Sequence, residues 1–515
     1  MATFNLSTML REATLANPDK VAVILDENVL PYRMVDGAAD RVAQALRDGG
    51  IAPGSAVGLM LPNVPQFPIV YNGILRAGCT AVPMNVLLKA PEVRYYLEDS
   101  EAQAFFYWAD FAAEAVRGAA DVTGLRLRVS VAALPGGTAP PGSEDFMSLL
   151  MSVTPSGDIA PTRPDDTAVI LYTSGTTGKP KGALLTHDNL LMNCIVGARI
   201  SAATADDVTL GTLPFFHAFG ASNVMNTSIY AGGTLSLLPR FDPVRALQMI
   251  QRDRISVFAG VPTMYIAFLK AYAEGEWDVS SLRLAISGGA ALPEQVLREF
   301  EEKFGTPILE GYGLSESSPS ATFNRPDRPR KVGSIGLPIW GVELKVLGDD
   351  GQTLGDGENG EICIRGHNVM KGYHNRPEAT AETIDGDGWL HTGDIGYRDA
   401  DGYYFIVDRK KEMVIRGGFN VYPREIEEVL YQHPAVAEAA VFGTPDPTMG
   451  EEVVAAVALR AGMSAGEDEL IGFCKERVAA YKYPRRVWVL ETLPKGPTGK
   501  ILKLELKAQL VPAQA

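Results

Sequence analysis

The sequence predicts an α/β fold, with a large N-terminal domain of α/β subdomains with mainly parallel sheets and a small α+β domain after it. Short apolar runs rich in Val, Ile and Leu alternate with helix-length segments up to about residue 408. Such alternation is typical of parallel sheets covered by helices. Beyond that point the pattern becomes a compact helix–strand–strand–helix–strand series. The length of 515 residues predicts roughly three domains' worth of polypeptide.

The predicted strands of the large domain are short apolar runs. They are 21–25, 56–61, 104–108, 167–173, 208–213, 233–238, 256–260, 282–287 and 306–310. Helices are predicted between several of them, at 187–200, 242–253 and 293–304. The last begins at Pro293, a residue suited to a first helical turn, and its apolar positions form one stripe.

Two loops and the C-terminal region complete the predicted organisation. Residues 133–166 are rich in Pro, Gly, Ser and Thr, which predicts a connector between two subdomains. Gly355, Gly357 and Gly360 match G-x-G-x-x-G but lead into the strand-like EICIR, so we expect a hairpin loop and not a dinucleotide site. The C-terminal series has a helix from Pro423, strands near 436–442 and 452–459, a helix near 467–479 and a strand near 486–490.

Composition limits the partners of the protein. A net charge of −15 argues against nucleic acid and anionic membranes, which basic surfaces bind. The four cysteines are far apart and form no C-x-x-C pair, as expected of a cytoplasmic protein with reduced thiols. Arg11 and Glu12 stand where a signal peptide would be apolar. No apolar run has the ~18 residues of a transmembrane helix, whereas peripheral membrane contact and a homodimer stay open.

Residues 172–182, YTSGTTGKPKG, form a loop after an apolar strand. Glycines allow backbone N–H groups to point at an anion, and hydroxyls and lysines add donors and charge. The loop therefore suits a polyphosphate. It is no Walker loop, because two residues separate Gly175 and Gly178 and Pro180 follows the lysine.

This loop resembles the phosphate loop of the adenylate-forming superfamily, which includes acyl-CoA synthetases, peptide-synthetase adenylation domains and beetle luciferases. Further family motifs follow in order, so the resemblance covers nearly the whole chain. It implies an ATP site, with a β-barrel-like portion in the large domain. The implied phosphate-binding residues are Thr173, Ser174, Gly175, Thr176, Thr177, Gly178, Lys179 and Lys181.

Two motifs in the middle of the chain are implied to surround the acid and the adenine. In PFFHAFG (214–220), the resemblance places His217 in the acyl pocket beside the reacting carboxylate. In SGGA (287–290), it places adenine beside Gly289 and Ala290, with Gly289 also at the floor of the acyl pocket. Small residues there let a flat ring approach the backbone.

The EGYGLSE motif, residues 310–316, offers a ring face and hard oxygens. The resemblance implies that Tyr312 contacts the base and that Glu316, joined by Thr173, binds Mg²⁺, which prefers oxygen ligands. Ser315 stands where the family more often has Thr, so the hydroxyl is kept. The implied nucleotide-binding residues here are Glu310, Gly311, Tyr312, Gly313 and Ser315.

The remaining motifs lie around the change of domain. Asp394 in WLHTGD and Arg409 in VDRKKE are implied to bind the ribose, and Lys411 matches the family hinge. Gly417 and Gly418 in RGGFNVYP are implied to line the coenzyme A channel, and this form looks more like bacterial fatty acyl-CoA synthetases. Lys500 in PKGPTGK matches the lysine that supports adenylation.

The resemblance therefore implies an acid–thiol ligase with Lys500, His217 and Glu316 as catalytic residues. A carboxylic acid, expected to be a medium- or long-chain fatty acid, attacks ATP to give acyl-AMP and pyrophosphate, and coenzyme A then takes the acyl group. The implied domains are 1–408 and 412–515, with a hinge at 409–411, about which the C-terminal domain rotates.

Other functions stay open at this stage. An aryl-acid CoA ligase differs only in the acyl pocket, and an adenylating enzyme that loads a carrier protein differs in the acceptor. A luciferase-type oxygenase shares the adenylation motifs, and a binding module without catalysis would release no pyrophosphate. A serine hydrolase is disfavoured because the chain has no G-x-S-x-G elbow.

Overall fold

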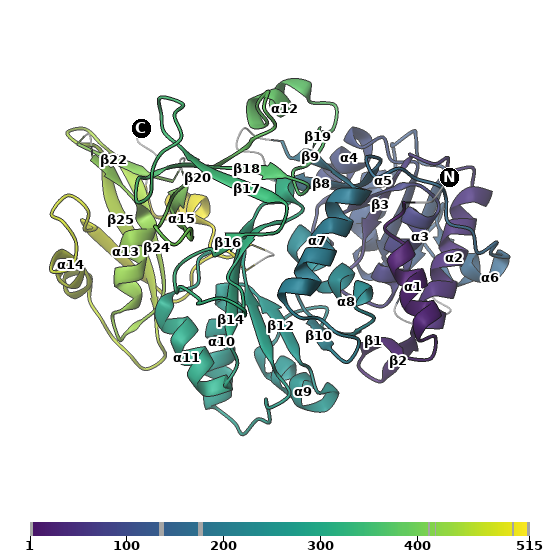
Figure 1. Cartoon of the computed structure of the whole chain (residues 1–515), viewed down its shortest axis with the longest axis horizontal. Coiled ribbons are helices and arrows are strands. Elements are labelled where there is room, and N and C mark those ends of the chain that lie inside the picture. Colours follow the sequence, from purple (N-terminus) through teal and green to yellow (C-terminus); the bar gives the residue numbers. More distant parts are fainter. Residues whose placement is uncertain are drawn as a thin grey trace.

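The computed structural model describes residues 4–132, 139–173, 179–409, 412–417, 419–496 and 499–511. It confirms the predicted α/β class. Two large sheets with their helices form most of the molecule, and the C-terminal part lies at the opposite end from the N-terminal helices (Figure 1).

The first large sheet has nine strands in the order β16-β15-β14-β13-β12-β10-β11-β1-β2. Its central strands, from β1 to β14, pair in parallel, so their carboxyl ends share one edge. The bounds are β1 (Val21–Leu25), β2 (Asn28–Pro31), β10 (Val208–Gly211), β11 (Thr234–Leu237), β12 (Val257–Gly260), β13 (Leu284–Ser287), β14 (Ile308–Gly313), β15 (Ser320–Phe323) and β16 (Leu337–Pro338).

The second large sheet has eight strands in the order β19-β9-β8-β4-β3-β5-β6-β7. Strand β8 leads into the glycine-rich loop and β9 returns antiparallel beside it. The bounds are β3 (Ala56–Met60), β4 (Thr80–Pro83), β5 (Ala104–Trp108), β6 (Leu127–Val131), β7 (Glu144–Asp145), β8 (Thr167–Thr173), β9 (Lys181–Thr186) and β19 (Gly372–Tyr373).

Helices cover these sheets through apolar stripes. The predicted stripe on α11 is buried, and Pro293 caps that helix one residue before its first turn. Three short 3₁₀ or π segments are η1 (Ala109–Phe111), η2 (Phe219–Asn226) and η3 (Ser315–Ser317). The α-helices of this region are α1 (Thr8–Ala16), α2 (Tyr32–Asp48), α3 (Gln66–Arg76), α4 (Ala90–Asp99), α5 (Ala112–Ala119), α6 (Phe146–Ser152), α7 (His187–Ile200), α8 (Thr227–Tyr230), α9 (Pro243–Asp253), α10 (Pro262–Ala273), α11 (Glu294–Phe304) and α12 (Pro377–Thr383).

The segment 133–166 differs from its prediction as a connector between subdomains. The strands on either side of it, β6 and β8, belong to the same sheet, and α2 and α7 carry the chain between the two large sheets. Within the segment lies helix α6, whose Leu149 and Leu150 are buried. This short apolar run was not predicted as a helix, because Pro- and Gly-rich stretches flank it. It is stable as a helix because it packs onto α2 and β6.

The portion expected to be barrel-like is a four-stranded antiparallel sheet, in the order β17-β18-β20-β21. Its strands are β17 (Val342–Leu347), β18 (Gly360–Gly366), β20 (Leu390–Arg398) and β21 (Tyr404–Arg409). The three-glycine loop joins β17 to β18, which pair antiparallel, so its prediction as a hairpin loop is confirmed.

The C-terminal part contains the predicted helix, two strands, helix and strand. Its apolar side chains form clusters of their own, which include Ile426, Val441 and Leu506. The bounds are β22 (Val414–Arg416), β23 (Phe419–Val421), α13 (Pro423–Tyr431), β24 (Val436–Asp446), β25 (Gly450–Leu459), α14 (Glu467–Lys475), β26 (Arg486–Leu490) and α15 (Lys503–Leu510). The boundary at 409–411 itself stays a prediction.

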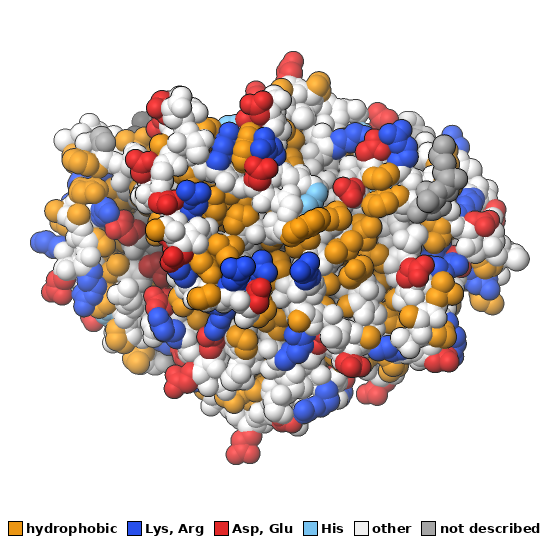
Figure 2. Space-filling view, in the orientation of Figure 1, with side chains coloured by type: hydrophobic (Ala, Val, Ile, Leu, Met, Phe, Trp, Pro, Cys, Tyr) orange, Lys and Arg blue, Asp and Glu red, His pale blue; other side chains and the backbone are white. Residues whose placement is uncertain are grey.

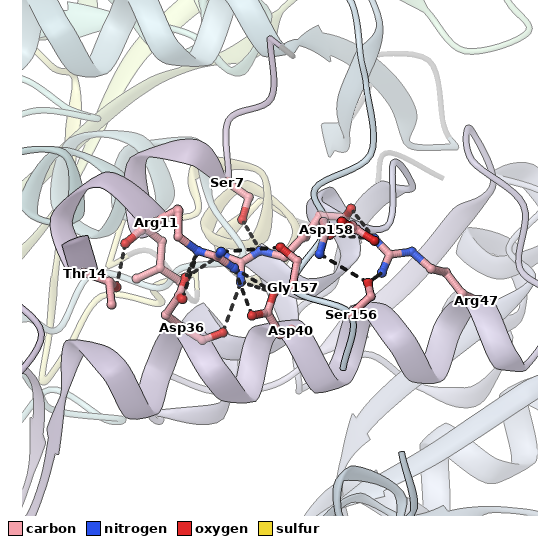
Figure 3. Close-up of polar contacts among 11 residues, drawn as sticks. Ser7, Arg11, Thr14, Asp36, Asp40, Arg47, Ser156, Gly157 and Asp158 are labelled. Carbon is pink, nitrogen blue, oxygen red and sulfur yellow. Dashed lines mark hydrogen bonds and ion pairs between the residues drawn. The ribbon is translucent and has the colours of Figure 1, made fainter. Parts of the chain in front are cut away.

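A buried charge network joins α1, α2 and α3 (Figure 3). The Arg76 side chain is fully buried and pairs with Asp36 at 2.7 Å and with Asp40 at 2.6 Å. Arg11 pairs with the same two carboxylates, at 3.0 and 2.9 Å, and the Arg76 Nε donates to the Ser7 hydroxyl. The N-terminal helices are therefore held together by charges as well as by apolar packing.

The surface carries acidic and basic side chains side by side, with apolar side chains exposed between them near the centre of the face in Figure 2. Within the ranges that the structure describes, none of the helices combines the length and apolar character that crossing a membrane requires.

Candidate active site

The predicted site residues meet at the carboxyl edge of the nine-stranded sheet. Parallel strands present their carboxyl ends at one edge, where α/β proteins bind ligands. Gly289 follows β13 and has φ +79°, a conformation that favours glycine. Glu310 and Tyr312 lie on β14, the next strand, so SGGA and EGYGLSE are neighbours in space.

Glu316 is brought together with Thr173, although 143 positions separate them in the sequence. The Thr173 hydroxyl lies 3.2 Å from Glu316 Oε1, and the Tyr373 hydroxyl donates to the same oxygen at 2.9 Å. Both contacts reach Oε1, and within the described ranges no hydrogen bond reaches Oε2. The pair that the sequence predicts as magnesium ligands is therefore adjacent.

Asp394 lies between an aromatic hydroxyl and a guanidinium. Tyr312 donates to its Oδ2 at 2.6 Å, and Arg409 Nε lies 3.2 Å from its Oδ1. Asp394 and Arg409 are register partners on β20 and β21, which explains why residues fifteen apart meet. Only 4% of Asp394 is exposed, and this burial raises its pKa despite the opposing charge of Arg409.

Lys500, in the C-terminal part, is influenced by the charges of Asp394 and Arg409. Burial lowers its pKa and so does the charge of Arg409, while Glu412 and Asp394 act in the opposite direction. The lysine is therefore close enough to Arg409 and Asp394 for their charges to act on it.

The Lys500 loop is fastened to the large domain by Thr263. The Thr263 hydroxyl, at the start of α10, donates to the Gly499 carbonyl at 3.1 Å. Gly499 has φ +77°, and a Cβ there would lie 2.7 Å from the Thr263 hydroxyl and 3.0 Å from Val261. Val261 also lies 3.5 Å from the position of a Cβ on Gly289. The lysine loop is thus seated beside the SGGA turn.

Thr263→Val is expected to weaken this seating with little effect on folding. Loss of one hydrogen bond costs ~0.5–1.5 kcal/mol, which corresponds to about a two- to tenfold slower step. We expect that loss in acid-dependent exchange of pyrophosphate into ATP, with Thr263→Ser close to wild type. Thioester formation from preformed acyl-adenylate should be unchanged, and an equal loss in both half-reactions would contradict the assignment.

His217 precedes η2, which forms as a π-helix, a geometry frequent at functional sites. Its Nδ1 accepts the Phe219 N–H at 3.3 Å, so Nε2 carries the proton of the neutral ring. Burial lowers the pKa of His217, which keeps it neutral. The Phe219 ring lies 3.2 Å from the position of a Cβ on Gly288, so PFFHAFG packs against SGGA as the prediction requires.

Close packing explains why positions 311 and 313 of EGYGLSE are glycines. A Cβ on Gly311 would lie 2.5 Å from the Phe323 ring. On Gly313 it would lie 1.6 Å from the Pro319 carbonyl oxygen. Neither position has room for a side chain. Ser315, at the start of η3, is half-buried.

Glu310 is buried at the edge of the sheet, with 8% of the residue exposed. Burial raises the pKa of its carboxyl to about 7, against the opposing charge of Arg424 in the C-terminal part and with support from the like charge of Glu428. The Glu310 carbonyl accepts the Asn324 N–H at 2.8 Å.

The raised pKa of Glu310 predicts a pH-dependent stability. A carboxyl whose folded pKa exceeds its unfolded value of about 4.5 favours the folded state below pH 4.5, and this contribution is lost as pH rises through 7. Glu310→Gln cannot ionise, so its free energy of unfolding should fall less than that of the wild type between pH 5 and pH 8. Urea unfolding at both pH values measures the difference, and parallel pH profiles would show that Glu310 does not titrate there.

Other predicted residues lie at the margins or outside the described ranges. Ser174, Gly175, Thr176, Thr177 and Gly178 lie outside them, as do Lys411 and Gly418. Of the flanking lysines, Lys179 lies 5.4 Å above the Tyr95 ring and Lys181 lies 5.3 Å above the Tyr373 ring. Ala290 is exposed beside Gly289.

Gly417 is held within the C-terminal part. Its N–H donates to the Met449 carbonyl at 2.7 Å, and its φ is +57°. No contact in the described ranges joins it to Lys500 or Asp394, so the structure does not bring the predicted coenzyme A residue to the adenylation group.

Sequence reasoning missed three residues of this site: Tyr373, Thr263 and Glu412. Tyr373 lies on the two-residue strand β19, which is too short to show any pattern. Thr263 follows Pro262 at a helix start, a signal that predicts the helix but not the distant partner of its hydroxyl. Glu412 lies in the charge run 408–412, where its ion pair with Lys503, at 3.1 Å, had no local signal.

The comparisons with known proteins agree with this geometry. Residues 10–374 match the family model described as AMP-binding enzyme, and residues 425–500 match AMP-binding enzyme C-terminal domain. A long-chain-fatty-acid–CoA ligase from Bacillus subtilis (strain 168) is 37% identical over an alignment that is 529 positions long. The alignment covers 97% of this chain and 94% of that protein. A feruloyl-CoA synthase from an Amycolatopsis species is 37% identical over 495 residues, which cover 95% and 96%.

The structural likeness extends over the same length. The crystal structure of ATP-bound MatB from Rhodopseudomonas palustris has a TM-score of 0.91 and 32% identity, and the likeness covers 99% of both chains. The fold and the site define an adenylate-forming protein. The chain belongs to the AMP-binding enzyme family and is an AMP-forming acid–thiol ligase.

Proposed function

We propose that the enzyme joins a carboxylic acid to ATP as an acyl-adenylate, with release of pyrophosphate, and then transfers the acyl group to coenzyme A. The observation that carries this proposal is the hydrogen bond that holds the Lys500 loop to Thr263 of the large domain, where the charges of Asp394 and Arg409 act on the lysine. A cation held there meets the charge that develops as the carboxylate attacks the α-phosphorus. The acid–AMP bond forms and the bond to pyrophosphate breaks.

Each motif has a part in this step. Thr173, Lys179 and Lys181 flank the loop that we propose for the β- and γ-phosphates, Ser174–Gly178. Gly289, Ala290 and Tyr312 would hold the adenine, and Asp394 with Arg409 the ribose. His217, neutral through burial, would donate from Nε2 toward the carboxylate.

Magnesium suits the oxygens of Glu316 and Thr173. Mg²⁺ binds through one or two carboxylates together with substrate phosphates and water. Glu316 offers Oε2 for this, while Oε1 accepts the two hydroxyls. Within the described ranges no group of three or more His, Cys, Asp or Glu side chains is placed to hold a metal ion, so a metal here would depend on the nucleotide. When bound, it would neutralise the polyphosphate.

The second step requires a thiol near the site that Lys500 occupies in this structure. We propose that residues 412–515 rotate about a hinge at 409–411, centred on Lys411, and present Gly417 and Gly418 to coenzyme A. Support comes from the separate apolar clusters of this part, which allow it to move as a unit.

For the acid, we propose a medium- or long-chain fatty acid, on the basis of the RGGFNVYP segment and of the fatty-acid ligase among the relatives. An aryl acid is the second candidate, because the feruloyl-CoA synthase is equally identical. We propose a cytoplasmic location from the acidic charge and the scattered cysteines.

Exchange of labelled pyrophosphate into ATP tests the proposal. With Mg²⁺ and a panel of fatty and aromatic acids, at least one acid should support exchange, and EDTA should abolish it. AMP should then form on addition of coenzyme A. Failure of every acid to support exchange would refute the function. Exchange without acyl-CoA would instead point to a carrier protein as the acceptor.

A further inference from the structure

Helix α13, the first helix after the predicted hinge, begins without a cap of its own. Its N-cap residue, Tyr422, makes no side-chain hydrogen bond to the first turn. Instead, the Asp408 carboxylate, on strand β21 of the large domain, accepts the Arg424 N–H at 3.1 Å. A carboxylate at this end of a helix satisfies a free N–H group and interacts favourably with the helix dipole. A residue before the hinge therefore caps a helix that lies after it.

The Arg424 side chain makes further contacts across the same boundary. Its Nη1 donates to the Ile406 carbonyl, on β21, at 2.7 Å. Burial raises the pKa of Glu310 on β14 to about 7, and the charge of Arg424 opposes this rise, so the guanidinium lies near that carboxyl. Strand β21 belongs to the four-stranded sheet and β14 to the nine-stranded sheet. One residue of α13 therefore interacts with two sheets of the large domain.

Glu428, one turn after Arg424 on α13, lies at this boundary as well. Burial raises the pKa of its carboxyl, whereas the charge of Arg424 and the backbone N–H of Glu294 lower it. Glu294 is the first residue of α11, and the N-cap residue of that helix, Pro293, makes no side-chain hydrogen bond to it. The guanidinium of Arg424 therefore acts on one carboxylate from each side of the hinge.

These contacts depend on the arrangement of the two parts. Residues 310, 406 and 408 precede the predicted hinge at 409–411, and residue 424 follows it. Rotation about the hinge moves the partners relative to each other, and a hydrogen bond weakens steeply when its distance and angle change. Contacts that form in one arrangement and break in another shift the population toward the first. The first arrangement here is the one in which the Lys500 loop is bonded to Thr263.

We infer that Arg424 is a positioning residue for adenylation, which holds the C-terminal part in the arrangement that brings Lys500 to the candidate active site. It does so through its hydrogen bonds to Ile406 and Asp408 and through its charge beside Glu310. Arg424 acts through Lys500, and we assign it no contact with the reacting atoms. This inference rests on the proposed function, including the rotation of the C-terminal part.

Arg424→Met tests this role, because methionine keeps much of the side-chain volume and removes the guanidinium. We would measure both half-reactions with the acid that best supports pyrophosphate exchange: the exchange itself, and thioester formation from the synthetic acyl-adenylate and coenzyme A. A hydrogen bond from a charged donor is typically worth about tenfold or more in an equilibrium, so exchange should fall by about tenfold. Thioester formation should be unchanged or faster, because the same contacts must break before that step.

Two further variants separate positioning from stability. Arg424→Lys keeps the charge and an N–H donor, so most of the exchange rate should return. Arg460→Met is the matched control, because Arg460 Nε donates to the Val436 carbonyl at 3.2 Å and both residues lie in the C-terminal part. It removes a bond between a guanidinium and a strand carbonyl that does not cross the hinge. The ratio of the two half-reactions should therefore stay at its wild-type value.

The inference and the proposed function fail separately. An equal loss of both half-reactions in Arg424→Met would overturn the inference, because a weakened fold lowers the two together. An unchanged ratio in Arg424→Met, or a ratio that falls as far in Arg460→Met, would overturn it as well. Arg424→Gln gives the same comparison if Arg424→Met fails to fold. If the wild type supports no pyrophosphate exchange with any acid, the proposed function itself fails.

Discussion

Lys500→Ala is expected to slow the formation of acyl-adenylate by ~10²–10³-fold, because removal of one well-placed electrostatic stabiliser typically costs that much. The lysine lies near Asp394 and Arg409, and burial strengthens its charge interactions. Acid-dependent pyrophosphate exchange measures the step. The second half-reaction, started from synthetic acyl-adenylate and coenzyme A, should keep near wild-type rates.

Lys495→Ala provides the matched control. Lys495 lies five residues earlier and pairs with Glu438, at 2.5 Å, within the C-terminal part. Its loss removes the same charge from the same region, but not from beside Asp394. We expect exchange within about twofold of wild type, because no contact in the described ranges joins the partly buried Lys495–Glu438 pair to Asp394 or Arg409. Equal losses in the two variants would mean that net charge, and not the position of Lys500, matters.

The order and type of the main elements were predictable from local pattern. Every predicted strand of the large domain is present, and α11 buries its predicted apolar stripe. Periodicity and turn residues are local signals, so they predict elements well. Helix α6 was missed because its apolar run is short and lies between Pro- and Gly-rich stretches, where packing decides the outcome.

The candidate site was predictable only where a motif carried it. Glu316 and Thr173 were paired through resemblance, and the structure brings them within 3.2 Å. The roles of Tyr373 and Thr263 could not be predicted, because each side chain contacts a distant segment of the chain. Tyr373, on strand β19, donates to Glu316, and Thr263, on α10, donates to the Gly499 carbonyl. No spacing rule relates such partners, because the sheets and the docking of the C-terminal part bring them together.

The largest expected effect on stability comes from Arg76→Ala. Arg76 is fully buried, and its guanidinium pairs with both Asp36 and Asp40. Removal of one partner of a buried ion pair leaves an uncompensated charge and costs ~3–5 kcal/mol. Arg11 remains to compensate in part, since it reaches both carboxylates. The urea midpoint of the large domain should fall accordingly, with the slope unchanged.

Two further variants separate charge from packing. Arg33→Ala removes an exposed arginine paired with Asp19, and should cost under about 1 kcal/mol. In Arg76→Met combined with Asp36→Leu and Asp40→Leu, both carboxylates leave with the buried guanidinium, and the charge that stays is that of the partly exposed Arg11, so part of the lost stability should return. If the triple variant were less stable than Arg76→Ala, the pairing of Arg11 with Asp36 and Asp40, which only the triple variant removes, would contribute more to stability than the unpaired charge costs.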